Sequence, residues 1–348
     1  MRIGLIARAD LTGLAAQTSA FYRHMKPAAT LIVDFQKYGY NLDLSMYPDG
    51  DVQIWDTPCE NPPLIQPDDV VEEFLHKVDL VFTCETPYNW WLFKRAKESG
   101  VKCVLQPNYE FMEYLLHPEL PQVDLLALPS EWHIHDIREK LAHLNIKYLP
   151  VPVDREKFPF TLRTELNTIL HTAGNGAQPD RNGTLFLLEA MNLVKSPVKC
   201  TIRAIKPIMG GYRGSRNITM FVNDVQHPWQ LYRDEDLFVF PRRFGGLCLP
   251  MQEAMSVGMP VITSDMSPQN TFMPAEFLPT SLDHILMTRA PIEVRNIEPQ
   301  DLATRIDYLF DHPGTFREMS YVADHWAEQI SWSRFRSIYL QAFEALWM

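Results

Sequence analysis

The chain has 348 residues and a formal net charge of −11, with 46% hydrophobic and 22% charged residues. These values are typical of a globular protein with room for two domains, and they exclude a disordered chain and a broadly basic nucleic-acid binder. The five cysteines are scattered, which predicts reduced thiols. The start of the chain predicts a strand and not a signal peptide, and the chain has no run of about 18 apolar residues. We therefore expect a cytoplasmic protein.

Strand and helix patterns alternate in the first part of the chain. A glycine turn, "DLTG", follows the first apolar run and precedes a helix. Short β-rich runs predict strands at 2–8, 29–35, 78–85, 102–108 and 124–130, and helical periodicity predicts helices at about 14–24, 89–100 and 131–144. This alternation predicts an α/β fold with a doubly wound parallel sheet, whose ligands bind at the carboxyl ends of the strands.

The alternation is interrupted at "YLPVPVDREKFPF" (148–160), which has three prolines and no helical period. Strand and helix patterns then return, and the last helix carries an apolar stripe at helical spacing. The strands are expected at 167–176, 199–206, 217–222 and 236–241, and the helices at 183–194 and 333–347. We therefore expect a Rossmann-like domain at 1–152, a second Rossmann-like domain at 153–326, and a C-terminal helix at 327–348 that packs on the first domain.

The stretch "PRRFGGLCLPMQEAMSVGMPVITSD" (241–265) predicts a strand, a glycine turn, a short helix and another strand. Gly245 and Gly246 permit a tight turn that a ligand can approach closely. Pro250 suits the first turn of the helix and Gly258 its end. The free N–H groups of the turn and the positive end of the helix dipole would then meet at the carboxyl end of a strand, which favours phosphate binding.

Glu253 lies one turn into that helix. A carboxylate is repelled by phosphate, so it is suited to accept hydrogen bonds from neutral hydroxyl groups beside the anion site. A sugar nucleotide offers a diphosphate and, about a turn away, ribose hydroxyls. The alternative is an ordinary β-α-β unit with a solvated glutamate.

The chain resembles the retaining GT-B glycosyltransferases, particularly family 4, over nearly its whole length. The motifs that carry the resemblance occur in the family's order; they are "ALPSEW", "LPVPVDREKF", "DRNGTLFLLEAM", "GGLCLPMQEAMSVGMPVITSD" and "QISWSRF". The block around the glycine turn is the specific one. The resemblance implies that the Rossmann-like domain at 1–152 lies on the acceptor side and that the one at 153–326 binds the nucleotide sugar. It also implies transfer of a sugar from a nucleotide-diphosphate sugar, UDP- or GDP-linked, without a metal or other cofactor.

In that family two glutamates bracket the glycine loop. The resemblance assigns the ribose contact to Glu253, whereas the position of the sugar-contacting glutamate is Gly245 here. The family's lysine for the departing diphosphate corresponds to Asn182, and the preceding Arg181 can supply the charge. The family's arginine aligns with Gly176. The alternative sources of positive charge are Lys206, Arg242 and Arg243.

In the first domain, Gly13 matches a glycine turn near the donor phosphate. Strand ends direct Glu85 and Glu110 to the cleft that the resemblance implies, together with Thr86 and Asn108. The candidate catalytic residues are therefore Arg181, Glu85 and Glu110, and the candidate donor-binding residues are Gly13, Asn175, Gly176, Arg181, Lys206, Arg243, Gly245, Gly246, Leu247, Cys248 and Glu253.

The sequence does not identify the acceptor, which is a glycan, a lipid, a protein or modified DNA. "GGLCLP" without the usual glutamate is similar to divergent, phage-type members of the family, some of which glycosylate modified bases in DNA. The same motifs are also compatible with a sugar-nucleotide epimerase and with a catalytically silent sugar-nucleotide-binding protein. The sequence predicts no particular oligomeric state.

Overall fold

The computed structural model describes residues 1–56, 68–116, 123–174, 180–207, 217–222, 225 and 228–348. The chain divides into one compact unit of Met1–Val151 with Trp332–Met348, and a second of Pro152–Ser331. The expected boundary after residue 152 lies beside the first division. The one expected after residue 326 falls inside helix α9 (Pro313–Gln329), because that helix continues unbroken.

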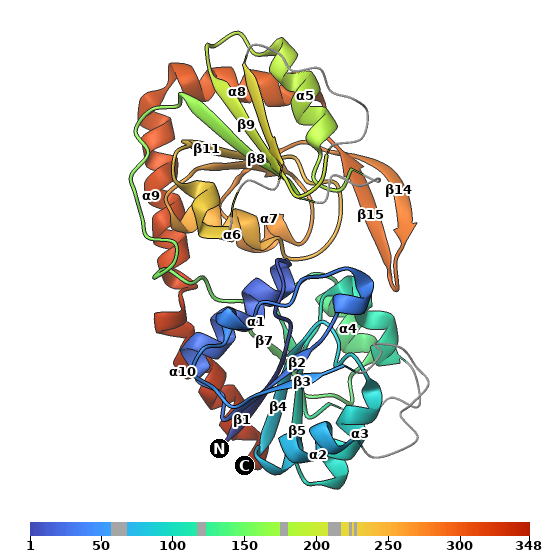
Figure 1. The fold of residues 1–348 in the computed structure, drawn as a ribbon. Coiled ribbons are helices and arrows are strands. Elements are labelled where there is room, and N and C mark those ends of the chain that lie inside the picture. Colours follow the sequence, from blue (N-terminus) through green and yellow to red (C-terminus); the bar gives the residue numbers. More distant parts are fainter. Residues whose placement is uncertain (57–67, 117–122, 175–179, 208–216, 223–224, 226–227) are drawn as a thin grey trace. The chain divides into compact units, whose positions relative to one another are not determined.

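The first unit contains a seven-stranded parallel sheet in the order β3-β2-β1-β4-β5-β6-β7 (Figure 1). Its strands are β1 Ile3–Ala7, β2 Ala29–Val33, β3 Val52–Trp55, β4 Leu80–Cys84, β5 Lys102–Gln106, β6 Leu125–Leu128 and β7 Ile146–Tyr148. Its helices are α1 Gly13–Met25, α2 Asp69–His76, α3 Trp90–Glu98, α4 Ile134–Lys140 and α10 Trp332–Glu344, with short 3-10 helices η1 Gln36–Tyr38, η2 Leu44–Met46, η3 Tyr109–Leu116 and η5 Ala345–Trp347.

Two apolar cores cover the two faces of this sheet, because successive side chains of a strand point to opposite sides. On β4, Val81 packs in the core that contains α2, α3 and α4, whereas Phe82 packs in the core that contains α1 and α10. The C-terminal helix α10 enters this second core through Tyr339 and Phe343, whose rings are almost fully buried. The last helix of the chain is therefore part of the first unit.

The second unit contains a six-stranded parallel sheet in the order β10-β9-β8-β11-β12-β13, and a separate antiparallel hairpin of β14 and β15. Its strands are β8 Thr168–Gly174, β9 Lys199–Ala204, β10 Ile218–Val222, β11 Leu237–Phe240, β12 Val261–Ser264, β13 Glu276–Leu278, β14 Ser281–Met287 and β15 Pro291–Asn296. Its remaining helices are α5 Thr184–Leu193, α6 Leu249–Ser256, α7 Gln269–Phe272, α8 Pro299–Asp311 and the 3-10 helix η4 Pro228–Tyr232.

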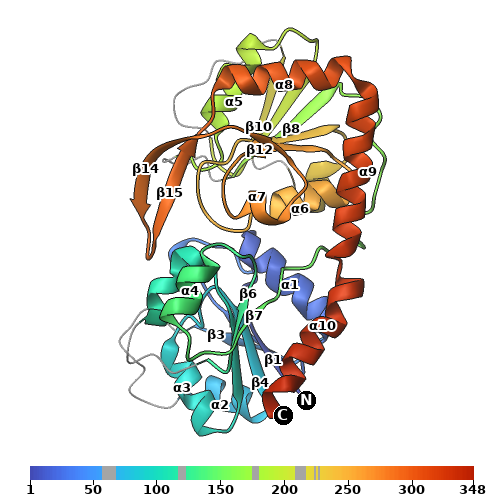
Figure 2. The ribbon, with the colours of Figure 1, turned by 180° about the vertical axis from the view of Figure 1, so that it is seen from behind.

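Side-chain alternation again separates two cores. On β11, Leu237 and Val239 pack with α5 and α8, and Phe238 and Phe240 pack with α6. Figure 2 shows α5 and α8 side by side along the sheet, with α6 and α7 nearer its carboxyl edge. The doubly wound α/β architecture that the sequence predicts is confirmed. In the described part of the chain, no helix combines the length and apolar composition that a membrane crossing requires.

Gly183 makes the close approach that brings α5 to the carboxyl end of β11. Its φ is +70°, and a Cβ placed there would lie 1.9 Å from the Pro241 carbonyl oxygen. We expect Gly183→Ala to lower the free energy of unfolding by about 3 kcal/mol, since the obstacle is backbone that cannot rotate away. Gly100 also has positive φ, of +75°, but has open space around it. In urea titrations Gly100→Ala should cost only about 1 kcal/mol. Equal losses for the two variants would contradict the role of the close approach.

Candidate functional site

The loop between β11 and α6 has the backbone that the glycine motif predicts. Gly245 has a φ of +96°, and Cys248, directly before α6, has a φ of +59°. The loop is anchored by the fully buried Gln269, whose Nε2 donates to the Gly246 carbonyl oxygen at 2.7 Å. Within the described residues, the backbone N–H groups of Gly246 and Leu247 donate to no acceptor. A rigid loop with free N–H groups before a helix start is suited to bind phosphate oxygens.

Arg181 lies against this loop. A Cβ built on Gly245 would be 2.0 Å from an Arg181 terminal nitrogen, so the guanidinium occupies the space that a side chain at 245 would need. The Arg181 Nε donates to the Phe244 carbonyl oxygen at 3.3 Å, and the Arg243 N–H donates to the Arg181 carbonyl oxygen at 2.9 Å. The structure thus brings the predicted charge and the predicted loop together. It also gives a physical reason for glycine at 245.

Asn182, which follows Arg181, is directed elsewhere. Its Nδ2 donates to the Thr172 carbonyl oxygen at 3.2 Å near the end of β8. Of the two neighbouring residues, Arg181 is therefore the one whose side chain reaches the glycine loop.

Glu253 lies on α6 and is half-buried. Its Oε2 accepts a hydrogen bond of 2.7 Å from the hydroxyl group of Tyr232, a buried residue at the end of η4. Burial raises the pKa of Glu253 to about 7, while the Tyr232 hydrogen bond and the charge of Lys157 act in the opposite direction. Tyr232 is a positioning residue that the sequence analysis missed, since a partner 21 residues away leaves no local pattern.

The other expected sources of charge differ in their surroundings. Arg243 donates from Nε to Asn296 at 2.8 Å and forms an ion pair of 2.9 Å with Asp283, which ties the loop to the β14–β15 hairpin. Arg242 is buried with its guanidinium over the Phe240 ring, and Lys206 is exposed beyond the end of β9. The expected donor-binding residues Asn175 and Gly176 lie outside the described residues.

In the first unit, the candidate residues gather at the carboxyl edge of the sheet. Gly13 begins α1, and a Cβ there would meet no atom within 4 Å. Glu85, just after β4, has a φ of +63°, and its Oε1 accepts from Asn108 Nδ2 at 2.9 Å. Glu110 is buried at the start of η3. Glu85 and Asn108, which the sequence placed at neighbouring strand ends, are thus in direct contact.

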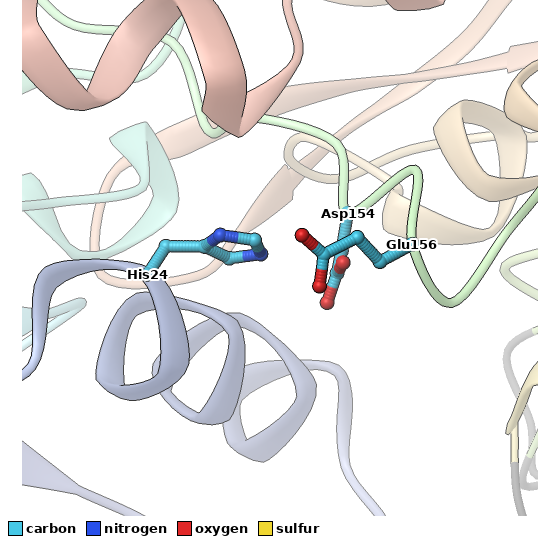
Figure 3. A group of neighbouring side chains, drawn as sticks. All are labelled: His24, Asp154 and Glu156. Carbon is cyan, nitrogen blue, oxygen red and sulfur yellow. The ribbon is translucent and has the colours of Figure 1, made fainter.

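Figure 3 shows His24, Asp154 and Glu156, whose side chains are types that bind metals. His24 belongs to the first unit, and the two carboxylates belong to the second. We assign no metal site to this group, because its side chains come from two different units.

The pKa of Glu253 predicts a pH dependence of nucleotide binding. In the ribose assignment of Glu253, ribose hydroxyls would donate to the ionised carboxylate, so below pH 7 a proton would have to leave Glu253 before a nucleotide binds. The affinity for UDP or GDP should therefore rise by up to about tenfold per pH unit below pH 7. Above pH 7 the affinity should stay constant. Glu253→Gln should weaken binding by about 1.5–3 kcal/mol and remove this slope. Calorimetry between about pH 5.5 and 8.5 measures both effects. An unchanged affinity in the variant would overturn the ribose assignment.

Residues 167–311 match the sequence model of the family described as glycosyl transferases group 1. This segment begins at β8 and ends with α8, so it contains Arg181, the glycine loop and Glu253. No curated protein matches the chain by sequence.

Solved structures match over the full length of the chain. A glycosyltransferase from Rickettsia africae has a TM-score of 0.68 at 14% identity, covering 99% of this chain and 98% of its own. The Anabaena protein HepE in complex with UDP and glucose has a TM-score of 0.68 at 13% identity, covering 99% and 100%. Sucrose-phosphate synthase from Thermosynechococcus elongatus has a TM-score of 0.66 at 13% identity, covering 99% and 100%. The two units together have the fold of these proteins.

Proposed function

We propose that this protein is a glycosyltransferase. The premises are that residues 167–311 match the group 1 glycosyl transferases and that the whole chain has the GT-B fold. The protein moves a sugar from a nucleotide-diphosphate sugar to an acceptor hydroxyl with retention of configuration and without a metal. The observation that carries the proposal is the Arg181 guanidinium against a glycine loop with free N–H groups. HepE, which shares the fold, has been solved with UDP and with UDP-glucose, and this supports a uridine nucleotide as donor.

In the proposed reaction, the bond between the sugar's anomeric carbon and the diphosphate oxygen breaks first. The negative charge that develops on the diphosphate is stabilised by Arg181 and by the N–H groups of Gly246 and Leu247. The acceptor oxygen then attacks the oxocarbenium-like sugar from the face that the diphosphate leaves. The acceptor proton passes to the departing diphosphate. This route gives retention without a protein nucleophile.

Glu253 holds the ribose in this proposal, and Tyr232 fixes the orientation of its carboxylate. Glu85, held by Asn108, and Glu110 contribute on the acceptor side. Binding of the ribose and diphosphate at fixed points places the anomeric carbon for attack, which lowers the entropic part of the barrier.

The experiment that tests the function is incubation with a panel of UDP- and GDP-linked hexoses and pentoses, with nucleotide release and sugar configuration followed by NMR. We expect release of the nucleotide diphosphate and a sugar product that keeps the anomeric configuration of the donor. Inversion would contradict the retaining mechanism. Tight nucleotide binding without turnover, across the donor panel with glycan, lipid and DNA acceptors, would support the silent binding protein. An epimerised free sugar would support the epimerase.

Chelation should leave the reaction essentially unchanged, because the charge of the leaving group is met by a guanidinium and backbone donors. The measurement is the rate of nucleotide release in excess EDTA, and then after adding Mn²⁺ or Mg²⁺. Loss of activity in chelator, with recovery on adding either metal, would contradict the metal-independent mechanism.

A further inference from the structure

A group of aromatic side chains lies at the carboxyl edge of the first sheet. Phe35 follows β2, Tyr40 follows η1, and Tyr88 follows β4. The ring centroids of Tyr40 and Tyr88 are 6.0 and 5.6 Å from that of Phe35, and Tyr38 lies at 5.6 Å. Strands β2, β1 and β4 are neighbours in the sheet (Figure 1), so the topology gathers these rings at one edge. We call Phe35, Tyr38, Tyr40 and Tyr88 the aromatic platform.

The platform is held in place by a buried ion pair. The Arg8 guanidinium, just after β1, lies 4.0 Å from the Phe35 ring centroid and 4.5 Å from that of Tyr40. Asp10, which is 4% exposed, accepts from Arg8 Nε at 2.7 Å and therefore neutralises this charge. Tyr88 has a φ of +63°, a backbone conformation that is costly for a residue with a side chain. Such strain is often retained where a side chain must be positioned for a ligand.

Two of the four rings reach solvent, since Tyr38 is 46% exposed and Tyr40 is 40% exposed, whereas Phe35 and Tyr88 are partly buried against the core. Exposed aromatic rings that share a partly buried ring at the ligand-binding edge of a parallel sheet are typical of a binding site. The proposed function assigns the nucleotide to the glycine loop of the second unit, and the acceptor is therefore the substrate that we consider for this edge.

The charges beside the platform select among the acceptor classes. The segments that follow β2, β1 and β4 at this edge, residues 34–46, 8–12 and 85–89, contain two basic residues, Arg8 and Lys37. Their acidic residues are Asp10, Asp34, Asp43 and Glu85. This excess of carboxylates repels the phosphates of DNA, which is bound through Lys and Arg. It suits a neutral carbohydrate, whose hydroxyls donate to carboxylates and whose C–H groups pack on the negative face of a tyrosine ring.

We propose that the aromatic platform binds a neutral carbohydrate acceptor by ring stacking. The identification of this carbohydrate as the acceptor rests on the proposed function, whereas binding of a carbohydrate to the platform does not require transferase activity. Of the acceptor classes that the sequence leaves open, the proposal favours a glycan. Binding of DNA at this edge is a result that the test below can detect and that would contradict the proposal.

The platform is tested by measuring the binding of three neutral linear oligosaccharides with saturation-transfer NMR and calorimetry. The oligosaccharides are maltohexaose, cellohexaose and chitohexaose. We expect at least one to bind, and Tyr38→Ala and Tyr40→Ala each to weaken it about tenfold, the size of one ring stacking contact. The matched control is Tyr308→Ala on α8, because Tyr308 is 39% exposed and lies 4.6 Å from the Arg305 guanidinium, much as Tyr40 lies against Arg8. The control should bind like the wild type, and UDP affinity should be retained in both platform variants.

The outcomes separate the two proposals. Loss of oligosaccharide binding in the platform variants, in a protein that turns over no donor, would support the platform and contradict the transferase. Transfer to a bound oligosaccharide with a raised acceptor KM in the platform variants would support both. The platform is overturned if none of the three oligosaccharides binds, if Tyr40→Ala binds as the wild type does, or if a hydroxymethylated DNA duplex binds at this edge instead.

Discussion

Arg181→Ala should lower kcat by about 10²–10³-fold, the loss expected for one donor to a developing oxyanion. Negative charge on the diphosphate grows as the glycosidic bond breaks, so the guanidinium stabilises the transition state more than the bound donor. The change in donor affinity should therefore be smaller than the change in kcat. Steady-state kinetics of nucleotide release, with calorimetry of UDP binding, separates the two quantities.

Arg181→Lys serves as the conservative control. An ammonium retains the positive charge but cannot donate to the loop with the planar fork of a guanidinium, so it should recover only part of the lost rate. If Arg181→Ala turns over as fast as the wild type, the stabilising charge must come from Lys206 or from the Arg242–Arg243 pair.

Gly245→Ala should lower kcat by about 10–100-fold although it removes no functional group. The new methyl would enter the space of the Arg181 guanidinium, 2.0 Å from its terminal nitrogen, and the flexible side chain would have to move. A displacement of about 1 Å of a catalytic group can cost about 10²-fold in rate. The positive φ of Gly245 adds about 1 kcal/mol of strain, which a urea titration would detect separately.

A double-mutant cycle distinguishes displacement of Arg181 from general damage to the loop. If Gly245→Ala acts through Arg181, it should change kcat by less than about threefold when added to Arg181→Ala, because the group that it displaces is already gone. Additive losses in the double variant would show instead that the loop itself is disturbed.

The fold and the backbone geometry of the candidate donor site follow largely from patterns within the sequence. The turn at Gly245, the helix with Pro250 in its first turn and the end at Gly258 are all local features, and the structure has each of them. The strands predicted from apolar runs have counterparts in the two parallel sheets for the same reason, since a buried strand of a parallel sheet is a continuous apolar run.

Several features that the sequence analysis missed lack such a local signal. The β14–β15 hairpin is joined by a short link with no Asn-Gly or Asp-Gly turn, and every residue of β14 except Leu286 is exposed, so it has no apolar alternation. Tyr232 beside Glu253, and Gln269 beneath Gly246, are contacts between residues far apart in the chain. The aromatic platform depends on the order of three strands, which is a property of the sheet and not of any one segment.

The central claim is that the glycine loop and α6 hold the nucleotide diphosphate. The most direct test is hydrogen–deuterium exchange measured with and without saturating UDP or GDP. We predict slower exchange on nucleotide binding in peptides that cover 244–256 and 180–184, and a loss of that protection in Glu253→Gln at the same nucleotide concentration. Nucleotide binding that protects other segments and leaves 244–256 unchanged would contradict the account, as would failure of both nucleotides to bind.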